Sequence, residues 1–192
     1  MNLIILIPLH KFNFRKNAFF ILLIFILFSC KTNRINTART TLNRSYTIDL
    51  QNCIDNAMCT IELIPNSNLI IKKDAYNNNY IEIKKGRNTI IKYQFKKSKI
   101  PNSVDTNYSE ILYIEIDNYN KTIILKDIEL QEVKMTYGRL CYCKGSSGYF
   151  NIKKGDLELI LKKNKLTLNT NFSVENVPQM VTQIHEKITL QK

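Results

Sequence analysis

From Ser45 to its C-terminal end, the chain consists of short β-rich runs separated by turn-forming residues. Alternation of apolar and polar residues is clearest in Tyr80–Lys84, which a Gly-Arg-Asn turn joins to the β-rich run Thr89–Lys97. Runs that recur at intervals of about 8–12 residues are typical of an all-β sandwich or barrel. The sequence therefore predicts a mainly β fold, an antiparallel β-sandwich or open barrel built of hairpins, as a single domain over residues 45–192.

In the C-terminal segment the spacing of the apolar residues changes. Asn176 can cap a helix, Pro178 suits a first helical turn, and apolar residues then recur at helical spacing, namely Val177, Met180, Val181, Ile184 and Ile188. The pattern predicts a short amphipathic α-helix from Pro178 to about Lys187 that packs on the sheet.

The N-terminal segment has the organisation of an export signal. Lys11, Arg15 and Lys16 precede 12 apolar or small residues, Ala18–Ser29. Crossing a bilayer needs about 20 apolar residues, whereas a signal-peptide core has about 7–15. The run therefore predicts a signal peptide, and an uncleaved anchor is the alternative.

The end of this segment, Leu27-Phe28-Ser29-Cys30, resembles the lipobox of bacterial lipoprotein precursors, with Phe28 where a smaller residue is usual. The resemblance implies that Cys30 carries a diacylglyceryl group and becomes the mature N-terminus. Residues 1–29 would then be removed, and residues 30–44 would form the lipidated cysteine and a flexible tether. Lys31 and Thr32 lack the aspartate of an inner-membrane retention signal, which favours the outer membrane.

The chain is basic. Of its 28 Lys and Arg residues, three lie in residues 1–29, whereas all 16 Asp and Glu residues follow, so the remainder carries 25 − 16 = +9. A basic, lipid-anchored chain can be drawn to anionic lipid, an anionic glycan or an acidic envelope protein. The export signal argues against nucleic acid. The lysine pairs are expected to blunt exposed strand edges, and a dedicated anion site is the alternative; they are Lys72-Lys73, Lys84-Lys85, Lys96-Lys97, Lys153-Lys154 and Lys162-Lys163.

Four cysteines remain besides Cys30, namely Cys53, Cys59, Cys141 and Cys143. An exported domain keeps such cysteines oxidised, so two disulfides are expected, with three connectivities open. A bond between Cys141 and Cys143 would need a break in the predicted strand. Bonds that link Cys53 and Cys59 to Cys141 and Cys143 are therefore favoured. A zinc site with these thiolates, or a redox pair at Cys141 and Cys143, is the alternative.

No catalytic constellation, cofactor or metal site is predicted. His185 has no evident partner, and Gly145–Gly148 (GSSG) is expected to be a tight turn. Several carboxylates are expected on an exposed strand face, namely Glu110, Glu115, Asp117, Asp127, Glu129 and Glu132. Most tyrosines are expected to be half-buried strand residues.

The sequence thus favours a lipid-anchored envelope lipoprotein whose disulfide-stabilised β domain binds or scaffolds another envelope component, without being an enzyme. The first alternative is an inhibitor or immunity-type protein that blocks a secreted enzyme with the loop Asp74–Asn79 or Ser98–Asn107. The second is a thiol-dependent redox enzyme that uses Cys141 and Cys143.

Overall fold

The computed structural model describes residues 45–51, 53, 54, 56–98, 107–117, 121–143, 145–162 and 164–190. They belong to one compact unit, Arg39–Lys192. The predicted signal peptide, Cys30 and the tether through residue 44 lie outside the described residues.

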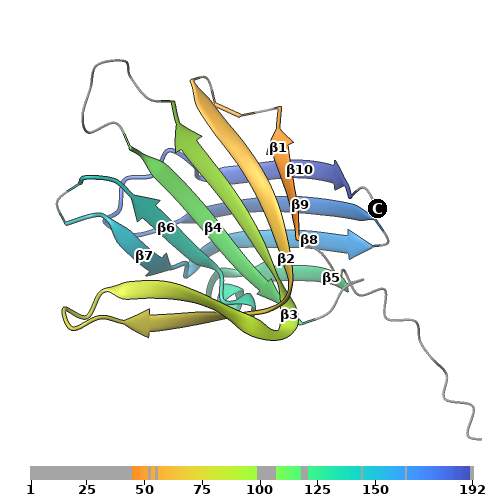
Figure 1. Ribbon diagram of the computed structural model, residues 1–192, viewed down its shortest axis with the longest axis horizontal. Helices are drawn as coiled ribbons and strands as arrows, with labels where there is room; N and C mark the ends of the chain where they lie inside the picture. The colour runs from red at the N-terminus through yellow and green to blue at the C-terminus, as the bar shows by residue number, and fades with distance from the viewer. Residues whose placement is uncertain are drawn as a thin grey trace, which may run out of the picture. The chain divides into compact units, whose positions relative to one another are not determined.

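Two antiparallel sheets form the domain (Figure 1). The six-stranded sheet has the order β1-β2-β3-β4-β6-β7, with bounds Tyr46–Leu50, Ala57–Lys73, Asn79–Lys97, Ser109–Ile116, Thr136–Leu140 and Gly148–Asn151. The four-stranded sheet has the order β10-β9-β8-β5, with bounds Gln183–Thr189, Lys165–Ser173, Lys154–Lys162 and Lys121–Lys126. A 3-10 helix, η1 (Asp127–Val133), links β5 to β6.

The main core lies between the two sheets, whose strands run across one another in Figure 1. Ile61 and Leu63 of β2 and Leu159 and Leu161 of β8 are fully buried in it. Each pair is two residues apart, so both side chains point to the same face of their strand. The alternation in the sequence therefore predicted the fold class correctly as mainly β and antiparallel.

A second core lies on the opposite face of the six-stranded sheet. The hairpin of β2 and β3 bends at a bulge between Pro65 and Ser67, where Asn66 has a φ of 52°. Its outer half folds back until Asn79 pairs with Tyr149 of β7, which closes part of the sheet on itself. The fold-back buries a small apolar cluster, namely Leu69, Ile90, Ile111 and Tyr113.

Glu115 of β4 holds this folded-back hairpin in place. Its carboxylate accepts hydrogen bonds from the Leu69 amide and from Asn88 Nδ2 (2.9 Å), and Lys134 Nζ lies 2.8 Å away. Lys134 also donates to the Leu69 carbonyl over 2.9 Å. The expected exposed position of Glu115 is therefore wrong, because both faces of β4 are buried.

The predicted C-terminal α-helix is also wrong. Residues 183–189 form strand β10, which pairs with β9, and the helix recorded in the described part of the chain is η1. Ile184 and Ile188 are four residues apart, a spacing that fits one face of a helix and one face of a strand. The exposed residues His185, Lys187 and Thr189 have the period of two that identifies the strand.

Candidate binding groove

A hollow of about 500 Å³ opens on the six-stranded sheet where β3 and β6 end and β4 begins. Sheet register explains its position, because Lys96 of β3 pairs with Ser109 of β4, which pairs with Leu140 of β6. We call this hollow the groove. Its lining residues are Gln94, Lys96, Asn107, Tyr108, Ser109, Leu140, Cys141 and Tyr142.

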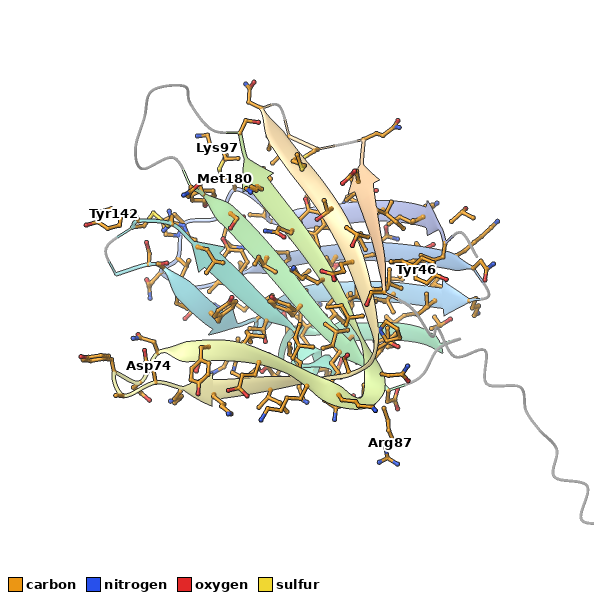
Figure 2. The ribbon with its side chains drawn as sticks, viewed as in Figure 1. Tyr46, Asp74, Arg87, Lys97, Tyr142 and Met180 are labelled. Atoms are coloured by element: carbon orange, nitrogen blue, oxygen red, sulfur yellow. A yellow bond between two sulfur atoms is a disulfide. The ribbon has the colours of Figure 1, made fainter. Side chains whose placement is uncertain are left out.

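One rim of the groove is the Cys141–Cys143 disulfide loop. Strand β6 ends at Leu140, the chain bends at Cys141 and Tyr142, and the disulfide joins Cα atoms 5.2 Å apart. Tyr142 is 90% exposed at the tip of this loop. Figure 2 shows Tyr142 pointing away from the domain, on the side opposite to Tyr46, where β1 begins.

The polar lining of the groove is rich in hydrogen-bond donors. Gln94 and Asn107 bring amides, Lys96 an ammonium group, and Ser109 a hydroxyl. Among the described lining residues there is no carboxylate. This arrangement suits a ligand that offers many acceptor oxygens.

Beneath the groove, Tyr108 belongs to a hydrogen-bonded chain that fixes its ring. Its hydroxyl donates to Glu110 and accepts from Arg139 Nε over 3.2 Å. The Arg139 guanidinium also lies 5.3 Å from the centre of the Tyr108 ring and donates to the Ser146 carbonyl over 3.2 Å. Burial, followed by the hydrogen bond to Glu110, raises the pKa of Tyr108. The hydroxyl therefore stays protonated, and this groove wall is held in one position.

Glu110 was expected on an exposed strand face, and this prediction is wrong. Its side chain is 1% exposed, and its carboxylate accepts hydrogen bonds from the amides of Met180 (2.7 Å) and Val181 (2.8 Å). Tyr137 is buried nearby, and its hydroxyl makes no hydrogen bond of regular geometry within the described residues. Burial, followed by the charge of Glu110, raises the pKa of Tyr137.

The two disulfides expected from the sequence are present, but the predicted connectivity is wrong. Cys53 pairs with Cys59, and Cys141 with Cys143. Cys59 aligns across the sheet with Phe95, Glu110 and then Arg139 of β6. Three strand spacings place β2 and β6 roughly 14 Å apart, and a disulfide needs Cα atoms within about 7 Å. The strand break that a Cys141–Cys143 bond needs is present, because β6 ends at Leu140.

The zinc site and the redox pair, the two alternative roles of the cysteines, have different outcomes. With all four sulfurs in disulfides, they do not form a thiolate zinc site in this structure, and the described residues contain no cluster of three or more metal-ligating side chains. A redox role for Cys141 and Cys143 stays a prediction. Labelling with a maleimide before and after reduction tests it.

The loop Asp74–Asn79, predicted as an inhibitory element, is a braced hairpin tip. The Asp74 carboxylate accepts hydrogen bonds from the amides of Tyr76 (2.9 Å) and Asn78 (2.8 Å) and from Asn78 Nδ2 (3.1 Å). The Asn78 backbone, followed by its side chain, lowers the pKa of Asp74. Tyr76 is 85% exposed at this tip. Of the other predicted loop, residues 99–106 lie outside the described part.

The remaining expected residues lie apart from the groove or have structural partners. His185 is exposed on β10. Gly145–Gly148 forms the expected turn, in which the Ser147 hydroxyl donates to the Arg139 carbonyl over 3.2 Å. The sequence named Lys96 as a member of a lysine pair, but it did not connect Lys96 with Gln94 and Ser109, because their proximity depends on strand register. The placement of Tyr142 between two cysteines was the one local signal available.

Comparisons with known proteins give no relative: no family model, curated protein or solved structure matches the chain. In the part of the chain that the structure describes, no helix combines the length and apolar character needed to span a membrane.

Proposed function

We propose that this chain is a lipid-anchored lipoprotein of the cell envelope, whose β domain binds or scaffolds another envelope component. The observation that supports the binding role best is the groove, which combines donor side chains with the exposed Tyr142 on a disulfide loop. The lipobox-like sequence at Leu27–Cys30 supports the anchor. The two disulfides suit an oxidising compartment.

Mass spectrometry of the native protein tests the anchor. The expected mature chain begins at Cys30 and carries the mass of a lipid on that residue. Cys30→Ser is expected to lose the lipid and the association with membranes. A retained leader with an unmodified Cys30 thiol would contradict the proposal.

Pull-down from detergent-solubilised envelope tests the binding role. The native lipoprotein is expected to retain an envelope protein or glycan, and Tyr142→Ala is expected to release it. Separation of inner and outer membranes is expected to place the protein in the outer membrane. Recovery of no envelope component under any extraction condition would contradict the binding role.

The hairpin tip favours a second candidate, an inhibitor or immunity-type protein directed against a secreted enzyme. A protruding aromatic residue on a braced turn can enter the cleft of a partner with little loss of conformational entropy. In this case the pulled-down partner is an enzyme. Its inhibition is lost with Tyr76→Ala and kept with Tyr142→Ala.

A further inference from the structure

We propose that the groove binds an acidic saccharide, meaning a sugar chain that bears carboxylate or phosphate groups. This inference rests on the binding role proposed above and names the ligand class of the same groove.

The positive charge of Lys96 in the groove lining favours an anionic ligand. Lys96 is exposed on the groove wall and makes no ion pair with any other described residue. The nearest acidic side chain by sheet register is Glu110, which lies below the wall with its oxygens occupied by Tyr108, Met180 and Val181. An ammonium group with no carboxylate beside it among the described residues is available to pair with the carboxylate or phosphate of a ligand.

The neutral polar groups suit a saccharide rather than a simple anion. The Gln94 and Asn107 amides and the Ser109 hydroxyl offer both donors and acceptors, which match the hydroxyl groups of sugars. They lie on two segments that the sheet brings together, β3 and the start of β4, so they can contact several positions along one chain.

Tyr142 supplies an exposed aromatic ring at the rim of the groove. Sugar rings present apolar C–H faces that pack on aromatic rings, which expose an electron-rich surface. The Cys141–Cys143 bond restrains the backbone on both sides of Tyr142. Less conformational entropy is therefore lost when a ligand packs on the ring.

A second hollow, of about 430 Å³, supplies a lysine that can serve as a control for Lys96. It contains Lys153 and Lys154, but Lys154 Nζ lies 2.6 Å from Glu175 Oε1. Its described lining residues include one aromatic ring, that of Phe150, but no tyrosine. Lys153 therefore serves as a matched charge control for Lys96, and Tyr76, 85% exposed, as a matched aromatic control for Tyr142.

Calorimetric titration of the full chain in detergent micelles tests the proposal. The probes are a galacturonic acid oligomer, its neutral methyl ester, a phosphorylated mannose oligomer and a glutamate oligomer of equal charge. We expect one of the two acidic sugars to bind, which identifies the acidic group. Lys96→Gln and Tyr142→Ala are each expected to weaken that binding by about tenfold. Lys153→Gln and Tyr76→Ala are expected to leave it within about twofold, with circular dichroism confirming the fold of every variant.

Several results would overturn the inference. Equal weakening by Lys96→Gln and Lys153→Gln would show attraction to net charge alone, and equal binding of the glutamate oligomer would assign the groove to acidic peptides. Equal binding of the methyl ester, or no binding of either acidic sugar, would also overturn it. None of these results affects the proposed anchor and binding role, which depend on the mass at Cys30 and on the partners recovered by pull-down.

Discussion

The Val181 amide donates a hydrogen bond of 2.8 Å to the Glu110 carboxylate, although the two residues are 71 positions apart in the sequence. The bond connects the centre of the six-stranded sheet to the segment that leads into β10 of the other sheet. Because Met180 donates to the second carboxylate oxygen, both oxygens of Glu110 are occupied.

Glu110→Gln is expected to lower the free energy of unfolding by about 2–3 kcal/mol, because an amide presents an N–H group to one of the two backbone donors and leaves it unpaired. Urea denaturation measures the change. Glu62→Gln is the control, because Glu62 forms a partly exposed pair with Lys92 at 3.2 Å, and its change is expected to stay below about 1 kcal/mol. Equal effects of both variants would contradict the structural role of Glu110.

Gly138→Ala is expected to destabilise the domain by about 1–3 kcal/mol. A Cβ atom at this position would lie 2.7 Å from Cε1 of Tyr149, whose ring covers the glycine. The same substitution is expected to cost less in a Tyr149→Ala background, so a double-mutant cycle measures the coupling. Additive effects would mean that the ring does not cause the cost.

Tryptic digestion without reduction is expected to show each disulfide within a single peptide. Trypsin cleaves after lysine and arginine, so Cys53 and Cys59 stay together in residues 45–72, and Cys141 and Cys143 in residues 140–144. Each peptide is expected to be lighter than its reduced form by the mass of two hydrogen atoms. A peptide that joins these two segments would support the cross-linked pairing instead.

Acid is expected to loosen the hairpin tip at Asp74. The pKa of Asp74 is lowered below its ordinary value of 3.8, first of all by the hydrogen bond from the Asn78 backbone. A carboxyl group whose pKa is lowered by folding stabilises the structure above its unfolded pKa, and this stabilisation is lost as the pH falls through the folded pKa. NMR should therefore show the Asn78 amide shifting with a midpoint below pH 3.8. In Asp74→Asn this shift should be absent, and a midpoint at or above 3.8 would contradict the bracing.

The sequence predicted what depends on local pattern. Alternation identified the antiparallel β fold, and the GSSG segment was correctly interpreted as a turn. Glu110 and Glu115 were misplaced because their partners are the backbone groups of Val181 and Leu69, which are distant in the sequence. An alternating pattern with glutamates indicates one solvent-exposed face, but both faces of β4 are covered. The fold-back of the β2–β3 hairpin covers the face with Glu115, whereas Glu110 lies on the opposite face, toward the other sheet.

Local sequence patterns could not predict the groove either. Lys96, Ser109 and Leu140 come together through the register of three strands, which no short stretch of sequence specifies. The C-terminal strand was mistaken for a helix because its apolar residues are four apart, a spacing that does not distinguish the two. Only the exposure of His185 and Lys187, which lie between Ile184 and Ile188, distinguishes a strand from a helix here.

The positions of Tyr46 and Tyr142 on opposite sides of the domain determine how it can be used. The groove beside Tyr142 lies apart from Tyr46, where the described chain begins, so a bulky polymer can reach the groove without passing the start of the first strand.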